Sequence, residues 1–215
     1  MGEECKRLAR EHGDLAALER CVESKENARC EERAAFCPLY RTMARWKDWG
    51  IPERERKLLR GDLLATKPLA PWLPLKAMKA RLAHKAGPQG MKGTETLIVL
   101  AGKCDEGKTL AATWALSRTG GYYVTACQFA GLKLDFDALK RANTLVIDQL
   151  GTEPSSDSEW AFSHILDVVD VRYANLRLTI LCSNMLRGTF ETRYTNIVAR
   201  RLRDDGVFIR VGGET

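Results

Sequence analysis

Residues 102–109 read GKCDEGKT and place two glycines, a lysine and a hydroxyl side chain at the spacing G-x-x-x-x-G-K-[ST]. An apolar stretch precedes them and a helix-prone stretch follows. A loop between a strand and a helix turns its backbone N–H groups toward phosphate oxygens, with the helix N-terminus behind them. Lys108 can then reach the β- and γ-phosphates, and the Thr109 hydroxyl can bind Mg²⁺. The predicted nucleotide-contacting residues are Gly102, Lys103, Cys104, Asp105, Glu106, Gly107, Lys108, Thr109 and Leu110.

Two acids make this loop unusual. Asp105 and Glu106 place carboxylates beside the site of a polyanion. They should repel phosphate unless they point outward or touch the metal ion. We therefore expect weaker nucleotide affinity than a glycine-rich loop would give.

A second motif follows in residues 145–149, which read LVIDQ. An apolar strand that ends in an acid is typical of a second magnesium ligand, so Asp148 is predicted to hold Mg²⁺ together with Thr109. The alternative is a strand that ends in a solvated aspartate. Gln149 can orient a water molecule but cannot take its proton, so slow hydrolysis is expected. Asn184 follows the apolar residues 178–183 and could hold the γ-phosphate or the attacking water.

Basic residues crowd one predicted helix at 190–203, namely Arg193, Arg200, Arg201 and Arg203. An arginine supplied by a neighbouring subunit can stabilise charge in phosphoryl transfer. The alternatives are a solvated basic face or contacts with a nucleic-acid backbone.

The elements that must position these residues alternate along the chain. Strands are predicted at 96–101, 122–125, 143–150, 178–183 and 207–211, and helices at 108–117, 136–141 and 190–203. A capping-box signature, Ser156-x-x-Glu159, predicts a further helix start. This alternation predicts an α/β fold with a central five-stranded parallel sheet flanked by helices.

The rest of the chain bounds the setting. It has 215 residues and a net charge of +6, and no apolar run long enough to cross a bilayer. No secretory signal is visible, so a cytoplasmic protein with reduced thiols is expected. Cys21, Cys30 and Cys37 cluster near His12 without zinc-site spacing, which leaves zinc or free thiols open.

Three regions are predicted from the same composition. Residues 1–48 are a helical arm that either packs on its own domain or docks on another protein, residues 49–93 are a linker, and residues 94–215 are the core.

The stretches LIVLAGKCDEGKTLAATWAL, TLVIDQLGTE, LTILCSNM and FETRYTNIVARRLRDDGVFIRVGG resemble the DnaC/IstB-like branch of AAA+ ATPases, and GIPERERKLL resembles the linker before their core. The resemblance implies ATP and Mg²⁺, self-assembly through the ATP site, contact with single-stranded DNA, and a DnaB-type replicative helicase bound by the N-terminal segment. It implies that Asn184 is a sensor residue and that Arg201 is an arginine finger. Gln149 stands where the family usually has an acid, and Asp105 where it usually has glycine.

The leading hypothesis is thus a helicase loader in which ATP acts as an assembly switch. The alternatives are an IstB-like helper of a transposase, a nucleotide-gated binding module with little turnover, and a P-loop small-molecule kinase. Asn184 and the arginine-rich last helix disfavour the kinase.

Overall fold

The computed structural model describes residues 44–63, 76, 78, 96–131, 133–152, 158–194, 198–204 and 206–211. The chain divides between residues 70 and 71 into two units, and each is described by itself. Most of the predicted helical arm, residues 1–43 with its cysteines, lies outside the described residues. The predicted division into arm, linker and core stays a prediction.

In the first unit, a short helix at 44–48 leads through Ile51 into α5, Glu53–Leu63. Two glutamates occupy the first turn of α5, where negative charge complements the helix dipole. Glu53 also pairs with Lys57 at 3.0 Å, one turn along the helix. The hydrogen bond and charge of Lys57 lower the pKa of the Glu53 carboxyl. Local sequence therefore accounts for where α5 begins.

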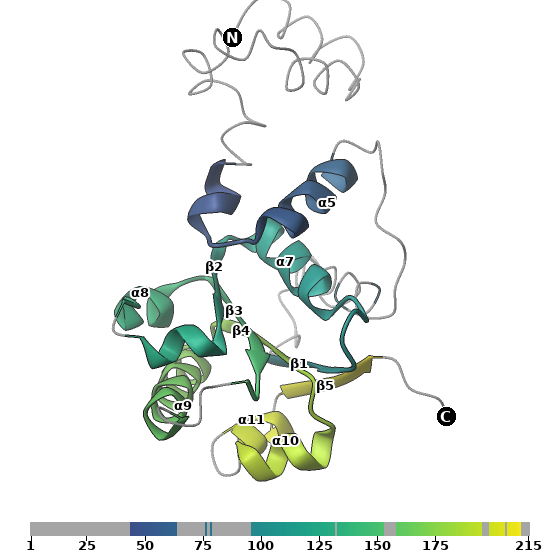
Figure 1. Cartoon of the computed structure of the whole chain (residues 1–215). Coiled ribbons are helices and arrows are strands. Elements are labelled where there is room, and N and C mark those ends of the chain that lie inside the picture. The colour runs from purple at the N-terminus through teal and green to yellow at the C-terminus, as the bar shows by residue number, and fades with distance from the viewer. Residues whose placement is uncertain are drawn as a thin grey trace, which may run out of the picture. The chain divides into compact units, whose positions relative to one another are not determined.

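The second unit contains one five-stranded sheet within its described residues (Figure 1). Its elements are β1 Leu97–Gly102, α7 Lys108–Thr119, β2 Gly121–Thr125, the 3-10 helix η2 Ala126–Ala130, α8 Phe136–Arg141, β3 Thr144–Leu150, α9 Ser158–Ala174, β4 Leu178–Ser183, α10 Arg187–Arg193, α11 Val198–Asp204 and β5 Gly206–Val211. The strand order is β2-β3-β4-β1-β5, and every pair is parallel. The predicted fold class is confirmed.

The sequences of the inner strands explain this sheet. β1 and β4 are buried along their whole length, as expected for parallel strands covered on both faces. The step from β1 to β2 runs one way across the sheet, and the later steps run the other way. Right-handed crossovers therefore place α7 on one face and α8 to α11 on the opposite face, as Figure 1 shows.

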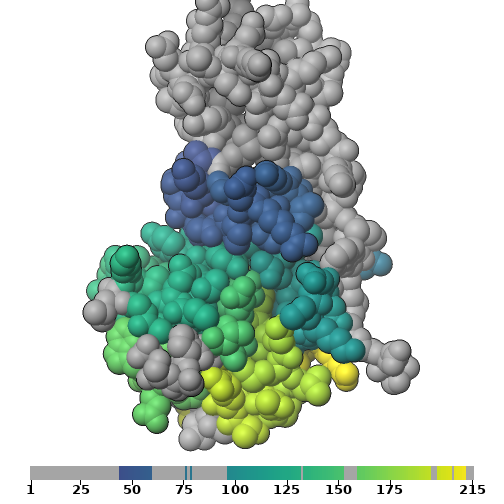
Figure 2. Space-filling model, viewed as in Figure 1, coloured from purple at the N-terminus to yellow at the C-terminus, as the bar shows by residue number. Residues whose placement is uncertain are grey.

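Side chains alternate between these two faces. Leu97, Val99 and Ala101 of β1 belong to the core cluster that includes Ile165 and Val169 of α9. The intervening residues of β1 are buried as well and face the other way. Figure 2 shows one face of the molecule, on which described residues of the second unit lie at the surface in teal to yellow-green.

One buried arginine lies at the amino-terminal ends of β3 and β4, the ends opposite to the phosphate loop. Arg172 of α9 is fully buried. Its guanidinium donates to the carbonyls of Leu139 (2.7 Å), Ala142 (2.8 Å) and Leu178 (2.6 Å), and to the Thr179 hydroxyl at 3.0 Å. Burial, and then the charge of Arg177, lowers the pKa of Arg172 to about 10, so the group stays charged at neutral pH. It thereby ties α8, α9 and β4 together.

The predicted helix at 190–203 is wrong in one respect, because the structure has two helices, α10 and α11, in this region. Tyr194 ends α10 with a non-helical backbone at φ −104° and ψ 40°. Its ring is buried and packs against Phe190 at 4.8 Å and Phe162 at 5.4 Å between ring centroids. These rings therefore hold Tyr194 in the core at the point where α10 ends.

Between residues 64 and 95, only Lys76 and Met78 are described, and both are helical. Ser156 of the capping-box signature lies outside the described residues. None of the helices in the described part of the chain has the length and hydropathy that a bilayer crossing requires.

Candidate nucleotide site

The phosphate loop lies at the carboxyl end of β1, where ligands of open parallel sheets commonly bind. β1 ends at Gly102 and α7 begins at Lys108. Gly107 precedes α7 with φ +81° and provides no side-chain cap, and the first turn carries no acid. The first N–H groups of α7 are therefore left for an anion.

Gly102 is required by close packing. A Cβ atom at this position would lie 2.0 Å from the Val211 carbonyl oxygen of β5 and 2.3 Å from Glu106 Oε2. The absence of a side chain at Gly102 thus allows Val211 of β5 and Glu106 of the loop to pack closely against the end of β1.

Lys108 is buried although it carries a charge, with 7% of its surface exposed. Its Nζ donates to the carbonyl oxygens of Gly102, at 2.8 Å, and Lys103. The amine therefore lies inside the curve of the loop, the place from which it could reach a phosphate.

Asp148 is the centre of the site's hydrogen bonds. It is 4% exposed. Thr109 Oγ1 donates to its Oδ2 at 2.8 Å, and the Gln149 backbone N–H donates to its Oδ1 at 2.7 Å. Burial, followed by the charge of Asp148, raises the pKa of the Cys182 thiol well above its usual value, so this neighbour stays protonated. Two residues predicted from separate motifs are thus in direct contact.

These two residues fit a magnesium ion. The Thr109 hydroxyl oxygen and the Asp148 carboxylate oxygen lie 2.8 Å apart, so both could bind one metal ion. Mg²⁺ binds few protein oxygens, usually carboxylates, together with substrate phosphates. Among the described residues, no group of three or more His, Cys, Asp and Glu side chains forms another candidate metal site.

Tyr123 joins the site and was not predicted. Its hydroxyl donates to Asp148 Oδ2 at 2.8 Å from the neighbouring strand β2. The only signal in the sequence is a tyrosine within the strand predicted at 122–125. The sequence does not show that this strand lies beside the strand that carries Asp148, so Tyr123 could not be assigned to the site.

The two acids of the loop take different positions. Asp105 is exposed and has φ +59°, a conformation that glycine adopts freely and aspartate tolerates better than most residues. This backbone explains why glycine suits the position. Glu106 Oε2 is buried with no hydrogen-bond partner in the described part of the chain. The expected weakening of phosphate affinity stays a prediction.

A β-bulge in β3 contains Asp148 and Gln149. The register of β3 against β4 shifts between Ile147 and Leu150, and Gln149 has φ +59°. Bulges of this kind re-aim side chains beside functional sites. Here Asp148 stays buried while Gln149 is exposed.

Asn184 lies against the phosphate loop, since its Nδ2 donates to Cys104 Sγ at 3.4 Å. The structure therefore brings together residues predicted from three separate segments: the loop, Asp148 and Asn184.

Arg201 is bound elsewhere in its own chain. Its Nε and Nη2 donate to Asp170 Oδ1 of α9 at 3.2 and 2.9 Å, and its guanidinium lies 4.4 Å from the centroid of the Tyr173 ring. The hydrogen bond to Asp170 raises the pKa of Arg201. A finger acts on the nucleotide of a neighbour, so its predicted role stays a prediction.

The strand order and the loop after β1 are the features to compare with known proteins. The chain is similar in fold to the DnaC helicase loader. The solved structure of that loader is 16% identical, with 75% of this chain and 100% of that chain covered and a TM-score of 0.49. DnaI is 22% identical over 65% of this chain and 82% of that chain, with a TM-score of 0.48.

Other similar structures are longer. DnaA from Aquifex aeolicus, bound to AMPPCP, is 16% identical over 65% of this chain, with a TM-score of 0.49. This chain spans 45% of the length of that DnaA and 44% of a DNA replication initiation factor that is 15% identical, with 63% of this chain covered and a TM-score of 0.46. No family and no curated protein matches the sequence. At these identities the likeness is one of fold.

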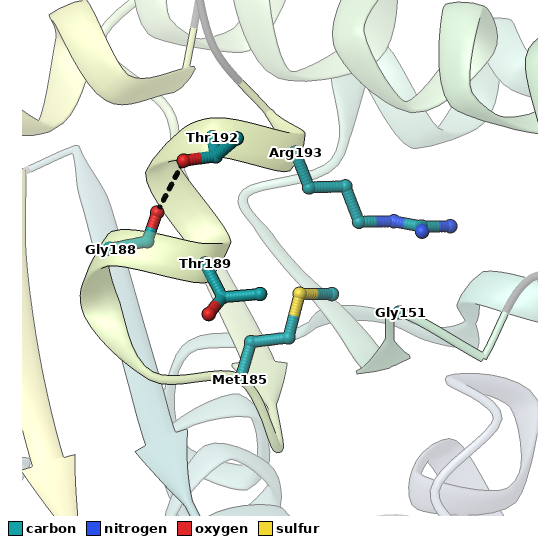
Figure 3. A pocket seen from close by; sticks show the side chains of 6 residues that line it. All are labelled: Gly151, Met185, Gly188, Thr189, Thr192 and Arg193. Carbon is teal, nitrogen blue, oxygen red and sulfur yellow. Dashed lines mark hydrogen bonds between the residues drawn. The ribbon is translucent and has the colours of Figure 1, made fainter.

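A hollow of about 590 Å³ lies between the ends of β3 and β4 and the helix α10 (Figure 3). Its lining residues are Gly151, Met185, Gly188, Thr189, Thr192 and Arg193. In Figure 3 the Met185 side chain lies between α10 and the strand end that carries Gly151. Met185 directly follows Asn184, so the hollow begins one residue from the predicted sensor.

Proposed function

We propose that this chain is an ATP-binding AAA+ protein that loads or remodels a DnaB-type replicative helicase on single-stranded DNA, with ATP acting as an assembly switch in the cytoplasm. The observation that carries the proposal is the 2.8 Å hydrogen bond from Thr109 to Asp148 at the mouth of a phosphate loop. It joins the two predicted magnesium ligands, and the likeness of the fold to a helicase loader agrees with it.

Each residue then has a role in binding. Lys108 and the first N–H groups of α7 hold the phosphates, and Thr109 and Asp148 hold Mg²⁺. Bound Mg²⁺ neutralises charge on the phosphates. Asn184, beside the loop, orients the γ-phosphate or a water molecule.

A nucleotide-gated binding module with little turnover is the second candidate. The exposed amide of Gln149 favours it, because this residue cannot accept a proton from an attacking water.

Replacing Gln149 with glutamate tests which candidate holds. The new carboxylate supplies a general base, a group worth roughly 10² or more in rate, so we expect steady-state ATP hydrolysis to rise at least about tenfold. Asn143→Asp makes the same charge change at an exposed residue just before β3, at the end of the strand away from the site, and should leave turnover unchanged. If Gln149→Glu leaves the rate at the wild-type level, the missing acid is not what limits hydrolysis.

The loader function is tested by co-purification with a DnaB-type helicase, with ATP, with ADP and without nucleotide, each with and without single-stranded DNA. We expect helicase to be retained, and the complex to bind DNA most strongly with ATP. A matched arm replaces the helicase with a transposase. Retention of the transposase alone would favour the IstB-like alternative, and retention of neither would refute both.

Self-assembly of the chain, measured with and without ATP, tests the arginine finger. We propose that Arg201 contacts the nucleotide of a neighbouring subunit. Arg201→Ala should then abolish ATP-dependent self-assembly while ATP still binds. Asp170→Asn is the matched control, because it weakens the same internal ion pair and keeps the arginine. If the two variants assemble equally poorly, the loss of the ion pair explains the defect and the finger assignment is wrong.

A further inference from the structure

We propose that Tyr123 is a positioning residue for Asp148 and that its phenol sets the affinity of the nucleotide site for Mg²⁺. This inference rests on the proposed function. The phenol hydroxyl donates to Asp148 Oδ2 at 2.8 Å, the same oxygen that accepts the Thr109 hydroxyl at 2.8 Å. Thr109 and Asp148 are the proposed metal ligands, whereas Tyr123 donates a hydrogen bond to one of these ligands.

The sheet fixes this contact. β2 pairs with β3 in parallel, with Tyr123 beside Val146 and Thr125 beside Asp148. Tyr123 and Asp148 therefore lie on the same face of neighbouring strands, at a diagonal that a long aromatic side chain can reach. The hydroxyl is held by two strands of the core and does not depend on a loop.

The Asp148 carboxylate needs a hydrogen-bond donor that is fixed in place, because rotation about its own terminal bond is only weakly restricted. The second torsion of an aspartate side chain varies broadly, so hydrogen bonds decide where its oxygens point. The Gln149 N–H holds Oδ1, but it belongs to the adjacent residue in the bulge and moves with Asp148. Thr109 reaches Oδ2 from α7, and Tyr123 reaches it from β2. Tyr123 is thus the donor that anchors Oδ2 to the sheet.

Magnesium makes this orientation matter. Mg²⁺ requires near-octahedral geometry with short bonds, so it discriminates strongly against a misdirected ligand oxygen. Loss of a hydrogen bond that orients a metal ligand typically lowers metal affinity 10- to 100-fold. We therefore expect Tyr123→Phe, which removes one oxygen and keeps the ring, to weaken Mg²⁺ binding about tenfold.

The chain offers a matched control in the preceding residue. Tyr122 lies on the same strand, points to the opposite face by strand alternation, and is 38% exposed. Tyr122→Phe removes the same oxygen from β2 without touching Asp148.

The test measures binding of a fluorescent ATP analogue to the full chain, first over a Mg²⁺ titration and then in EDTA. For Tyr123→Phe we expect the half-saturating Mg²⁺ concentration to rise about tenfold while affinity in EDTA is unchanged. Tyr122→Phe should match the wild type in both measurements. A general folding defect would lower affinity in EDTA as well, and thermal unfolding of each variant detects it directly.

Two results overturn the inference, and they are distinguishable. If Tyr123→Phe and the wild type have the same half-saturating Mg²⁺ concentration, the phenol does not position the ligand, although the ATP site stands. If the wild type binds the analogue neither with Mg²⁺ nor in EDTA, the proposed function fails and this inference fails with it.

Discussion

Replacement of Lys108 by alanine is expected to lower ATP affinity roughly a hundredfold. The amine is buried within the loop and would make charge-assisted hydrogen bonds to two phosphates, each worth about 1.5 kcal/mol or more. Two such bonds correspond to about 3 kcal/mol, which is a factor of 100 or more in affinity. Calorimetric titration with ATP and Mg²⁺ measures this directly.

Lys133 provides the control outside the phosphate loop. It is exposed, and Lys133→Ala removes an equal charge without changing the loop, so its effect should be small. Unfolding curves of both variants show whether the fold is kept, since Lys108→Ala also removes the donor to the Gly102 carbonyl. An ATP affinity for Lys108→Ala equal to that of the wild type would end the phosphate-cradle interpretation.

Replacement of Arg172 by methionine is expected to lower the free energy of unfolding by about 4 kcal/mol. Methionine fills much of the volume but donates no hydrogen bond, so the carbonyls of Leu139, Ala142 and Leu178 lose their donor. Each buried group left unsatisfied costs about 1–3 kcal/mol. Urea unfolding followed by circular dichroism gives the value.

Arg200→Met is the matched substitution on an exposed face of α11 and should change stability by no more than about 0.5 kcal/mol. A loss of less than about 1 kcal/mol for Arg172→Met would mean that water replaces the guanidinium at these carbonyls. The hydrogen bonds of Arg172 would then not be what holds the amino-terminal ends of β3 and β4 together.

Local pattern was sufficient for the elements with a strong apolar signal. The strand at 178–183 and the helix at 136–141 have the predicted bounds, and β1 and β3 differ from the predicted ranges by one residue. The helix predicted at 190–203 failed because the backbone leaves helical geometry at Tyr194, whose ring packs against Phe162 of α9. Tertiary packing of this kind leaves no mark on periodicity.

The site shows the same division. Two short motifs were enough to predict Lys108, Thr109 and Asp148 as site residues, because each motif places its own residues within one short segment, and their roles stay predictions. Tyr123 and the bulge at Gln149 depend on which strands are neighbours and in what register. Strand order and register join segments that are far apart in the chain, and local sequence patterns do not predict them.

The strand order has a consequence for the synthesis of the protein. β1 carries the phosphate loop, and its two neighbours are β4 and β5, the last two strands of the described part, since Leu97 pairs with Thr179 and with Gly206. Both pairings close long loops, which makes such contacts slow to form. While the ribosome is still translating the region before β4, β1 has neither of its partner strands. The N–H and C=O groups along both of its edges are then unpaired, and its apolar side chains are not yet covered. The phosphate loop is therefore synthesised before both strands that flank β1, and β1 can be paired on both sides only after β5 has emerged from the ribosome.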